Sequence, residues 1–308
     1  MSTVEISVVI PTYNRSLLLR HTLDALRRQT LDRDLFEVIV VDDGGSDDAE
    51  AVVAEFADVL DVTYFWQEDA GFRAGKARNI GTAIASGRYV VYVDTGVLLA
   101  TGTLAAHLRI HRDSTYPTAV VGYVYGFEVD PSMDGVMAAV DHADADATIA
   151  HLHAAGALDV RERQYAELGD AIGSWPAPFD VFWTCHASAE RSELLRAGLF
   201  DESFTSWGGE DVDLGVRLFQ LGDRFVMDRS ARSFHWPHAK EVSDLKESSA
   251  TAAERIHRKY DLWTTSFYGK DLQNEKYSLN KVILMDVERK SGNRPASSAT
   301  AGPEGSDA

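Results

Sequence analysis

The chain has 308 residues and a formal net charge of −18, with 30 basic and 48 acidic residues. Hydrophobic residues make up 45% and charged residues 25%, which excludes global disorder and predicts a sizeable core. The negative charge argues against a nucleic acid or an anionic membrane as the main partner. A single cysteine, Cys185, excludes an intramolecular disulfide and a cysteine-rich zinc site.

The sequence shows no targeting or membrane-spanning segment. Its first residues lack the basic start and long apolar stretch of a signal peptide. Apolar runs such as residues 38–41 and 89–93 are far shorter than the roughly 18 residues needed to cross a bilayer. We therefore expect a cytoplasmic protein without a membrane span, and no pattern points to a particular oligomeric state.

Short β-branched runs alternate with helical patterns in the first third of the chain. Strands are expected at residues 6–10, 36–41, 62–66 and 88–93, and helices at 16–29, 48–60 and 71–86. This alternation predicts an α/β fold with a mostly parallel central sheet and helices on both faces. Ligands bind outside the carboxyl ends of such strands, so residues 11–15, 42–46 and 94–96 should gather at one edge.

The rest of the chain is less regular. Residues 132–170 are rich in alanine, aspartate and histidine and predict one or two helices beside the sheet. Residues 239–250 are polar and are expected to form a mobile loop, followed by a helix at 252–260. Residues 291–308 are mainly small and polar, and they cannot bury enough apolar surface to become ordered.

Four motifs occur in one order between residues 4 and 240. They are Ser-Val-Val-Ile-Pro-Thr-Tyr-Asn-Arg at 7–15, Val-Val-Asp-Asp-Gly-Gly-Ser at 40–46, Gly-Phe-Arg at 71–73 with Ala-Arg-Asn-Ile-Gly at 77–81, and Trp-Gly-Gly-Glu-Asp at 207–211. Together they resemble family 2 glycosyltransferases with the nucleotide-diphospho-sugar (GT-A) fold. The version of the last motif is most similar to the subgroup with chondroitin polymerase and galactosyltransferase-type carboxyl-terminal domains.

The resemblance implies an activity and a domain organisation. Residues 1–240 would form the GT-A domain, with a nucleotide-binding half at 1–100 and an acceptor and catalytic half at 101–240. A helical and loop extension at 241–290 and a disordered tail at 291–308 would follow. The enzyme would move a hexose or N-acetylhexosamine from a UDP-sugar to an acceptor hydroxyl or amine with inversion of configuration. The acceptor would be a small molecule, such as a secondary metabolite, or a nonreducing sugar end.

The first two motifs are assigned to the nucleotide base. Asp43 can accept a hydrogen bond from the N3–H group of uracil, which cytosine lacks. The competing interpretation is that Asp42 and Asp43 cap the following helix. The resemblance also places the residues of the first loop on the nucleotide: Pro11, Tyr13 and Arg15.

The third motif is assigned to the diphosphate. Arg78 is the expected ligand, and Lys76 or Arg73 would add positive charge from the same helix. Their spacing does not put all three side chains on one helical face, so Arg73 and Arg78 are not expected to be equal partners. The alternative for Lys76 is a solvated helix residue.

The expected metal site departs from the family pattern. Family members usually carry Asp-x-Asp after the fourth strand, whose second Asp binds Mn²⁺ or Mg²⁺, whereas residues 94–96 are Asp-Thr-Gly. Asp94 would hold the ribose or the metal, but Gly96 supplies no ligand. His235 matches a histidine of the relatives and is the candidate second ligand, since Mn²⁺ accepts imidazole. The alternatives are a surface histidine and a metal-weak enzyme, and Gly96 also prompts the hypothesis of a noncatalytic nucleotide-sugar-binding protein.

The last motif is assigned to catalysis. Displacement of UDP needs a carboxylate that takes the acceptor's proton, and Asp211 matches the base of inverting members, with Glu210 orienting the acceptor. Acidic residues are also favoured at a helix start without any catalytic role. Gly208 and Gly209 argue against that simpler explanation, because they allow close backbone approach to a ligand. Retaining relatives with a similar motif typically lack Asp at this position, so Asp211 favours inversion over the retaining alternative.

Two further side chains are candidates for sugar contacts. Trp207 would offer its flat face to the donor sugar or the acceptor, unless it is a core tryptophan. Residues 183–186 are expected on a strand that lines the donor sugar, from which His186 would contact the donor. Cys185 in the same segment is expected to be a small buried residue without a nucleophilic role.

Overall fold

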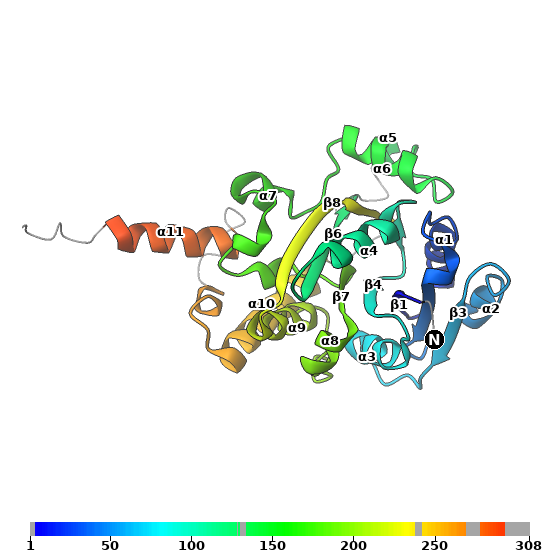
Figure 1. Cartoon of the computed structure of the whole chain (residues 1–308), viewed down its shortest axis with the longest axis horizontal. Helices are drawn as coiled ribbons and strands as arrows, with labels where there is room; N and C mark the ends of the chain where they lie inside the picture. Colours follow the sequence, from blue (N-terminus) through cyan, green and yellow to red (C-terminus); the bar gives the residue numbers. More distant parts are fainter. Residues whose placement is uncertain (1–3, 128, 130–133, 238–241, 269–277, 293–308) are drawn as a thin grey trace, which may run out of the picture.

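The computed structural model describes residues 4–127, 129, 134–237, 242–268 and 278–292. Within these residues eight strands form one sheet in the order β3-β2-β1-β4-β7-β6-β8-β5 (Figure 1). The strands are β1 Ile6–Thr12, β2 Phe36–Asp42, β3 Val62–Trp66, β4 Tyr89–Val93, β5 Val97–Leu99, β6 Thr118–Tyr125, β7 His186–Glu190 and β8 Arg224–His235. Strands β1 to β4 pair in parallel, as do β6 and β8, whereas β7 and β5 pair antiparallel with their neighbours. The predicted mostly parallel sheet is confirmed.

Helices cover both faces of this sheet, as predicted. They are α1 Ser16–Arg27, α2 Ala49–Ala54, α3 Ala74–Ile84, α4 Thr103–Asp113, α5 Asp134–Met137, α6 Ala145–Ala154, α7 Glu162–Leu168, α8 Arg191–Arg196, α9 Glu210–Leu221, α10 Val242–Tyr260 and α11 Leu279–Gly292. Leu19 of α1 packs on one face with Val8 and Ile10, while Ala77 of α3 packs on the other with Val9. This follows from the alternation of side chains along a strand.

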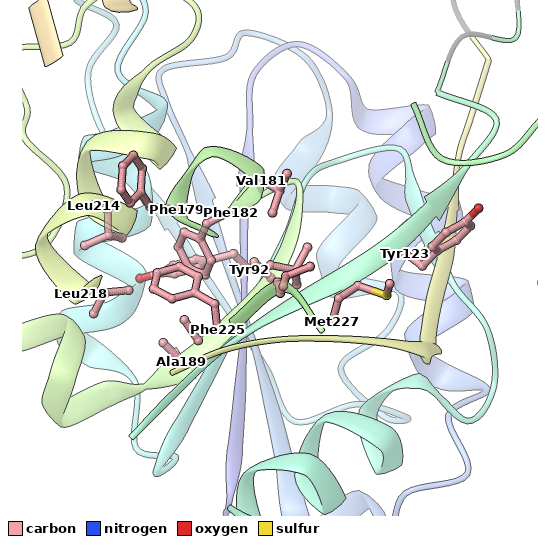
Figure 2. Close-up of a cluster of buried hydrophobic side chains, with 14 of the residues drawn as sticks. Tyr92, Tyr123, Phe179, Val181, Phe182, Ala189, Leu214, Leu218, Phe225 and Met227 are labelled. Carbon is pink, nitrogen blue, oxygen red and sulfur yellow. The ribbon is translucent and has the colours of Figure 1, made fainter. Parts of the chain in front are cut away.

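The core on the α9 side sets the position of that helix. The short 3₁₀ turns are η1 Arg33–Leu35, η2 Ile172–Ser174, η3 Pro178–Val181 and η4 Thr265–Phe267. Leu214 and Leu218 of α9 lie beside Phe179 and Phe182 in Figure 2. A Cβ on Gly215 would lie 3.1 Å from the carbonyl oxygen of Phe179, so the backbone of α9 packs directly on η3. The amino terminus of α9 is thereby held at the edge of the sheet.

Several expected elements differ in length or number. The helix expected at 48–60 is only α2, because residues 55–59 form turns, and residues 132–170 contain three helices instead of one or two. Strand β5, with three residues, was not expected. None of the helices in the described part of the chain combines the length and apolarity that crossing a bilayer requires.

The carboxyl-terminal expectations need correction where the structure describes them. Residues 242–250, expected in a mobile loop, form the first half of α10, while 239–241 lie outside the described residues. Ala252 and Ile256 of this helix are buried in the core at helical spacing, which anchors the polar turns before them. Residues 291 and 292 end helix α11, and the rest of the expected tail, 293–308, lies outside the described residues.

Three histidines form a buried hydrogen-bonded network between α4 and the sheet. The His107 ring bonds Ser188 Oγ at 2.8 Å and His186 Nε2 at 3.0 Å, and His111 Nε2 bonds the same serine at 2.8 Å. The other ring nitrogen of His186 bonds Ser233 Oγ at 2.9 Å. Burial lowers the pKa of all three imidazoles, to about 3 for His111 and His186, so the network is neutral at pH 7.

Acid should therefore destabilise the fold through this network. Below pH about 6.5 the unfolded chain binds protons that the three folded imidazoles exclude, so stability falls by about 1.4 kcal/mol per pH unit for each histidine. Urea unfolding between pH 7.5 and 5 should show a smaller loss of stability for His107→Gln than for the wild type. His153→Gln, which changes an exposed ring, should retain the wild-type pH dependence. Equal slopes for all three proteins would contradict this assignment.

Candidate active site

A cavity of about 1060 Å³ lies at the carboxyl ends of the first strands. Thr12 pairs with Asp42, and Thr95 Oγ1 donates to the Pro11 carbonyl at 2.9 Å, so the three expected loops meet at one edge. Most of the predicted site residues line this cavity: Pro11, Tyr13, Arg15, Asp43, Arg78, Asp94, Trp207, Gly208, Gly209, Glu210, Asp211 and His235.

Three residues predicted for the site, Lys76, Arg73 and His186, do not line the cavity. Lys76 is half-buried on α3, and it lies about 200° around the helix from Arg78, which faces the cavity. Strand β7 begins only at His186, and side chains alternate there, so Cys185 lines the cavity while His186 points into the histidine network. His186 as a donor contact is therefore wrong. Burial raises the pKa of the Cys185 thiol to about 12, which keeps it neutral.

Asp43 is held by two residues of the loop between β3 and α3, Gln67 and Arg73. The backbone N–H of Arg73 donates to Asp43 Oδ2 at 2.7 Å, its guanidinium lies 3.2 Å from Oδ1, and the Gln67 amide also donates to Oδ1. Burial raises the pKa of Asp43, and these donors oppose the rise. Arg73 thus positions Asp43 and is not part of the cavity wall. Gln67 was not anticipated, and its only sequence signal is its place directly after strand β3.

The turn around Asp43 does not serve as a helix cap. Asp42 accepts hydrogen bonds from the backbone of Gly45 at 2.6 Å and from Tyr64 Oη at 2.9 Å. The residue that precedes α2 is Asp48, and its side chain makes no cap hydrogen bond. The helix-capping explanation of Asp42 and Asp43 is therefore wrong, since Asp42 closes the turn and Asp43 faces the cavity.

The centre of the cavity holds one buried cation among three carboxylates. An Arg78 guanidinium nitrogen lies 2.8 Å from Asp94 Oδ1, and the other terminal nitrogen lies 3.3 Å from Glu210 Oε1 and 3.9 Å from Asp211 Oδ1. The arginine is 4% exposed. Burial alone would lower the pKa of Arg78, but the three carboxylates outweigh it and raise the pKa. The cluster carries a net negative charge that favours a cationic group nearby.

Glu210 and Asp211 begin helix α9. Burial raises the pKa of both carboxyl groups, and Arg78 opposes the rise. Thr184 Oγ1 donates a hydrogen bond to Asp211 Oδ1, while Glu210 Oε2 is buried without a hydrogen-bond partner among the described residues. The raised pKa suits Asp211 to accept a proton, because proton transfer is most efficient when the pKa of the base is close to the working pH.

The two glycines before this pair have different roles. Both have positive φ, 92° at Gly208 and 93° at Gly209. A Cβ on Gly209 would lie 2.5 Å from the Cβ of Ala252 in α10, so the absence of a side chain here permits the packing of α10. A Cβ on Gly208, which faces the open cavity, would have none of the described residues within 4 Å apart from its chain neighbours.

Helix α10 closes the cavity from the carboxyl-terminal side. Ala252, Ala253 and Ile256 line the cavity. At the end of the helix, Lys259 Nζ and Tyr260 Oη donate to Asp213 Oδ1 at 2.7 and 2.8 Å, and Asp213 is a fully buried residue of α9. The wall and the helix that carries the two catalytic candidates are thus tied together. Trp207 is 47% exposed at the cavity, so the explanation as a core tryptophan is wrong.

Asp94 and His235 are the two side chains that could bind a divalent cation. Asp94 lies just before β5, and its carbonyl oxygen accepts a hydrogen bond from the backbone N–H of Val97 at 2.9 Å. Val97 pairs with His235, so Asp94 and His235 reach the same cavity. The described residues contain no group of three or more side chains placed to hold a metal. A hard cation with six or more ligands would thus take most of its oxygens from phosphate and water. Gly96 has φ +94°, and a Cβ there would lie 3.3 Å from Leu18 Cδ1.

Sequence comparisons connect this site with sugar transfer. A profile described as "Glycosyl transferase family 2" matches residues 7–179. Validoxylamine A glucosyltransferase of Streptomyces hygroscopicus subsp. jinggangensis is 33% identical over 256 residues, which are 83% of this chain and 61% of that protein. Hyaluronan synthase of Pasteurella multocida is 28% identical over 92% of this chain and 30% of its own length. The chain therefore spans less than two thirds of these relatives.

Solved structures show the same fold. The structure of S. aureus TarS 1-349 in complex with UDP-GlcNAc aligns with a TM-score of 0.58 at 17% identity, over 82% of this chain and 66% of that one. The mannosyltransferase PcManGT from Pyrobaculum calidifontis, in complex with GDP-Man and Mn²⁺, aligns with a TM-score of 0.55 at 18% identity, over 94% and 80% of the two chains. The predicted GT-A fold is confirmed.

Proposed function

Because this chain belongs to glycosyl transferase family 2, we propose that it transfers a hexose or N-acetylhexosamine from a UDP-sugar to an acceptor hydroxyl or amine with inversion of configuration. One observation carries the proposal: the cavity joins a held carboxylate, Asp43, to a buried cluster of Arg78, Asp94, Glu210 and Asp211. A nucleotide-binding end and a proton-accepting centre in one cavity are what this reaction needs.

Asp43 selects the base in this proposal. Its carboxylate accepts the N3–H of uracil, and Gln67 and Arg73 hold it in the orientation that this contact requires. Pro11 and Tyr13 flank the base. Tyr13 Oη donates to Asp69 Oδ2 at 3.1 Å, which steadies the ring at the cavity rim.

Asp211 acts as the general base. It takes the proton of the acceptor as the acceptor oxygen bonds to the anomeric carbon and the bond from that carbon to the phosphate oxygen breaks. The bonding electrons leave with UDP. Thr184 orients the Asp211 carboxylate, Glu210 binds the acceptor, and Arg78 favours the ionised forms of both acids, opposing the burial that raises their pKa values. A single displacement of this kind inverts the configuration, which supports inversion over retention.

Asp94 and His235 would hold Mn²⁺ or Mg²⁺ with the diphosphate of the donor. A bound divalent cation supplies positive charge for the departing phosphate. The complex of PcManGT with GDP-Man and Mn²⁺ supports such a site on this fold. Since Gly96 faces α1, the two side chains and the substrate phosphates complete the site.

The acceptor in this proposal is a small molecule. The name of the validoxylamine A glucosyltransferase supports a glucosyl donor and a small acceptor, whereas the names of the hyaluronan and chondroitin synthases support a saccharide end. We place donor binding in residues 1–100 and acceptor binding in residues 101–240, with the wall from α10 added to the acceptor side.

A panel of UDP-sugars with Mn²⁺ or EDTA tests the function. We expect UDP and one UDP-hexose to raise the unfolding free energy by about 2.7 kcal/mol at 100 times the dissociation constant, and CDP to have no effect. Slow hydrolysis of the same UDP-sugar should depend on Mn²⁺, and NMR of the released sugar should show an inverted anomer first. Tight UDP binding without hydrolysis would instead favour a noncatalytic nucleotide-sugar-binding protein.

A further inference from the structure

Residues that follow position 100 form a wall of the cavity whose single side chains have no role in the proposed reaction. Phe127, Trp183, Ile256 and Tyr268 supply aromatic and aliphatic surface there, and Asp180 of η3 supplies one carboxylate. All of these residues lie outside the proposed nucleotide-binding half, as Asp211 does. The wall is therefore on the side where an acceptor must enter.

Asp180 has a neutral partner and no cation. Tyr268 Oη donates to Asp180 Oδ1 at 2.8 Å, and none of the ion pairs among the described residues includes Asp180. Burial raises the pKa of Asp180 to about 6, and the Tyr268 hydrogen bond opposes the rise. The carboxyl group is therefore mostly ionised at pH 7, although its surroundings are largely apolar.

The position of Asp180 is fixed by packing on three sides. Trp183 Nε1 donates to the Asp180 carbonyl oxygen at 3.0 Å. The Asn280 side chain of α11 exchanges hydrogen bonds of 2.8 and 3.1 Å with the backbone of Ala177, just before η3. Gly215 lets α9 pack on the other side of the turn. The carboxylate thus lies in a preformed wall, which lowers the entropy cost of ligand binding.

The charge balance of the cavity indicates what Asp180 binds. Acidic groups outnumber arginines on the wall: Asp43, Asp94, Asp180, Glu210 and Asp211 face Arg15 and Arg78. Asp43 already has the Arg73 guanidinium, and the three central acids share Arg78. Asp180, which is half-buried, is left for the ligand, and removing a charge from water is costly unless the charge is paired.

We propose that Asp180 is an acceptor-recognition residue that binds a protonated amino group, with Tyr268 holding the carboxylate in place. The proposal rests on the proposed function, because it treats this wall as the acceptor side of the active site. A neutral hydroxyl could donate a hydrogen bond to Asp180, but it would not balance the negative charge of the carboxylate. The ring of Phe127, whose centroid lies 6.2 Å from that of Trp183, adds a surface that favours a cation, while the Trp183 ring already has the Arg161 guanidinium 5.0 Å from its centroid. An acceptor with a carboxylate at this position would be repelled.

The test compares three sugars that differ at one substituent: glucosamine, glucose and N-acetylglucosamine. Their dissociation constants are measured by ligand-observed NMR at pH 7 on the full chain, with and without UDP and Mn²⁺. We expect glucosamine to bind the wild type at least about tenfold more tightly than the two neutral sugars, the effect of one charge-assisted hydrogen bond. Asp180→Asn should reduce this preference to within twofold and leave the UDP affinity unchanged.

Two further variants complete the experiment. Asp58→Asn makes the same charge change at an exposed position outside the cavity and should retain the full preference. Tyr268→Phe removes the hydrogen bond that keeps Asp180 ionised and should weaken glucosamine several-fold, which keeps the proposal testable if Asp180→Asn fails to fold.

Equal binding of the three sugars to the wild type, or a preference that survives both cavity variants, would overturn the role of Asp180. Failure of the wild type to bind UDP would instead overturn the proposed function. The dissociation constants measured without UDP show whether the wild type prefers glucosamine, whether or not UDP binds.

Discussion

Replacement of Asp211 by asparagine is expected to lower kcat by at least about 100-fold and to leave the affinity for UDP within about twofold. A general base typically contributes 10²- to 10⁴-fold to the rate. The asparagine keeps the size of the side chain and can keep the hydrogen bond with Thr184. The fold at the start of α9 should therefore be preserved. Steady-state transfer or hydrolysis of the UDP-sugar gives kcat, and calorimetry gives the dissociation constant of UDP.

The matched control for this prediction is Asp58→Asn, which changes one exposed aspartate far from the cavity wall. It should match the wild type in both measurements. Thr184→Val, which removes only the donor to Asp211, should lower kcat by a smaller factor than Asp211→Asn. If Asp211→Asn abolished UDP binding while turnover per bound donor stayed constant, Asp211 would belong to the donor site and not to the acceptor.

Replacement of Arg78 by methionine should have the largest effect on stability. It leaves Asp94, Glu210 and Asp211 without the buried cation that they share. Removing one partner of a buried ion pair typically costs about 3–5 kcal/mol, because the remaining charges stay desolvated. Urea unfolding at pH 7.5 should show a loss of this order, and UDP affinity should fall as well if Arg78 faces the diphosphate.

The pH dependence distinguishes a charge effect from a packing effect. The carboxyl groups of Glu210 and Asp211 already have raised pKa values through burial, and loss of Arg78 raises them further. Protonation as the pH falls through about 7, the raised pKa of Glu210, should therefore shrink the difference between Arg78→Met and the wild type. Arg78→Lys, which keeps one charge but loses the two-pronged contact, should lie between them. If the loss of unfolding free energy in Arg78→Met did not change with pH, the electrostatic explanation would be contradicted.

The sequence predicted the parts of the site that depend on local pattern. Runs of β-branched residues predict the parallel strands, and the carboxyl ends of parallel strands meet at one edge of the sheet, so the loops that carry Asp43 and Asp94 are expected at the same edge. Arg78 and Asp211 followed from their motifs. The structure brings all four into one cavity.

The parts that sequence reasoning missed depend on helix phase and on packing between distant segments. The sequence does not show which face of α3 lines the cavity: it is the face of Arg78, and Lys76, two residues earlier, lies on another face. His186 was placed toward the donor because the strand was expected to begin earlier, and a change of one position reverses the face. Asp180 and Tyr268 are 88 residues apart, and only the packing of α9 and α11 on η3 brings them together.

The tie between α10 and α9 also limits how such proteins can diversify. Lys259 and Tyr260 hold the buried Asp213, and Ala252 fills the space that the missing side chain of Gly209 provides. A recombination event that replaced only α10 would remove the Lys259 and Tyr260 hydrogen bonds to the buried Asp213 or create a clash at Gly209. Residues 209 and 260, and the segment between them, should therefore come from the same parent. We expect chimeras with crossovers outside this range to fold and to acquire the specificity of the donor protein.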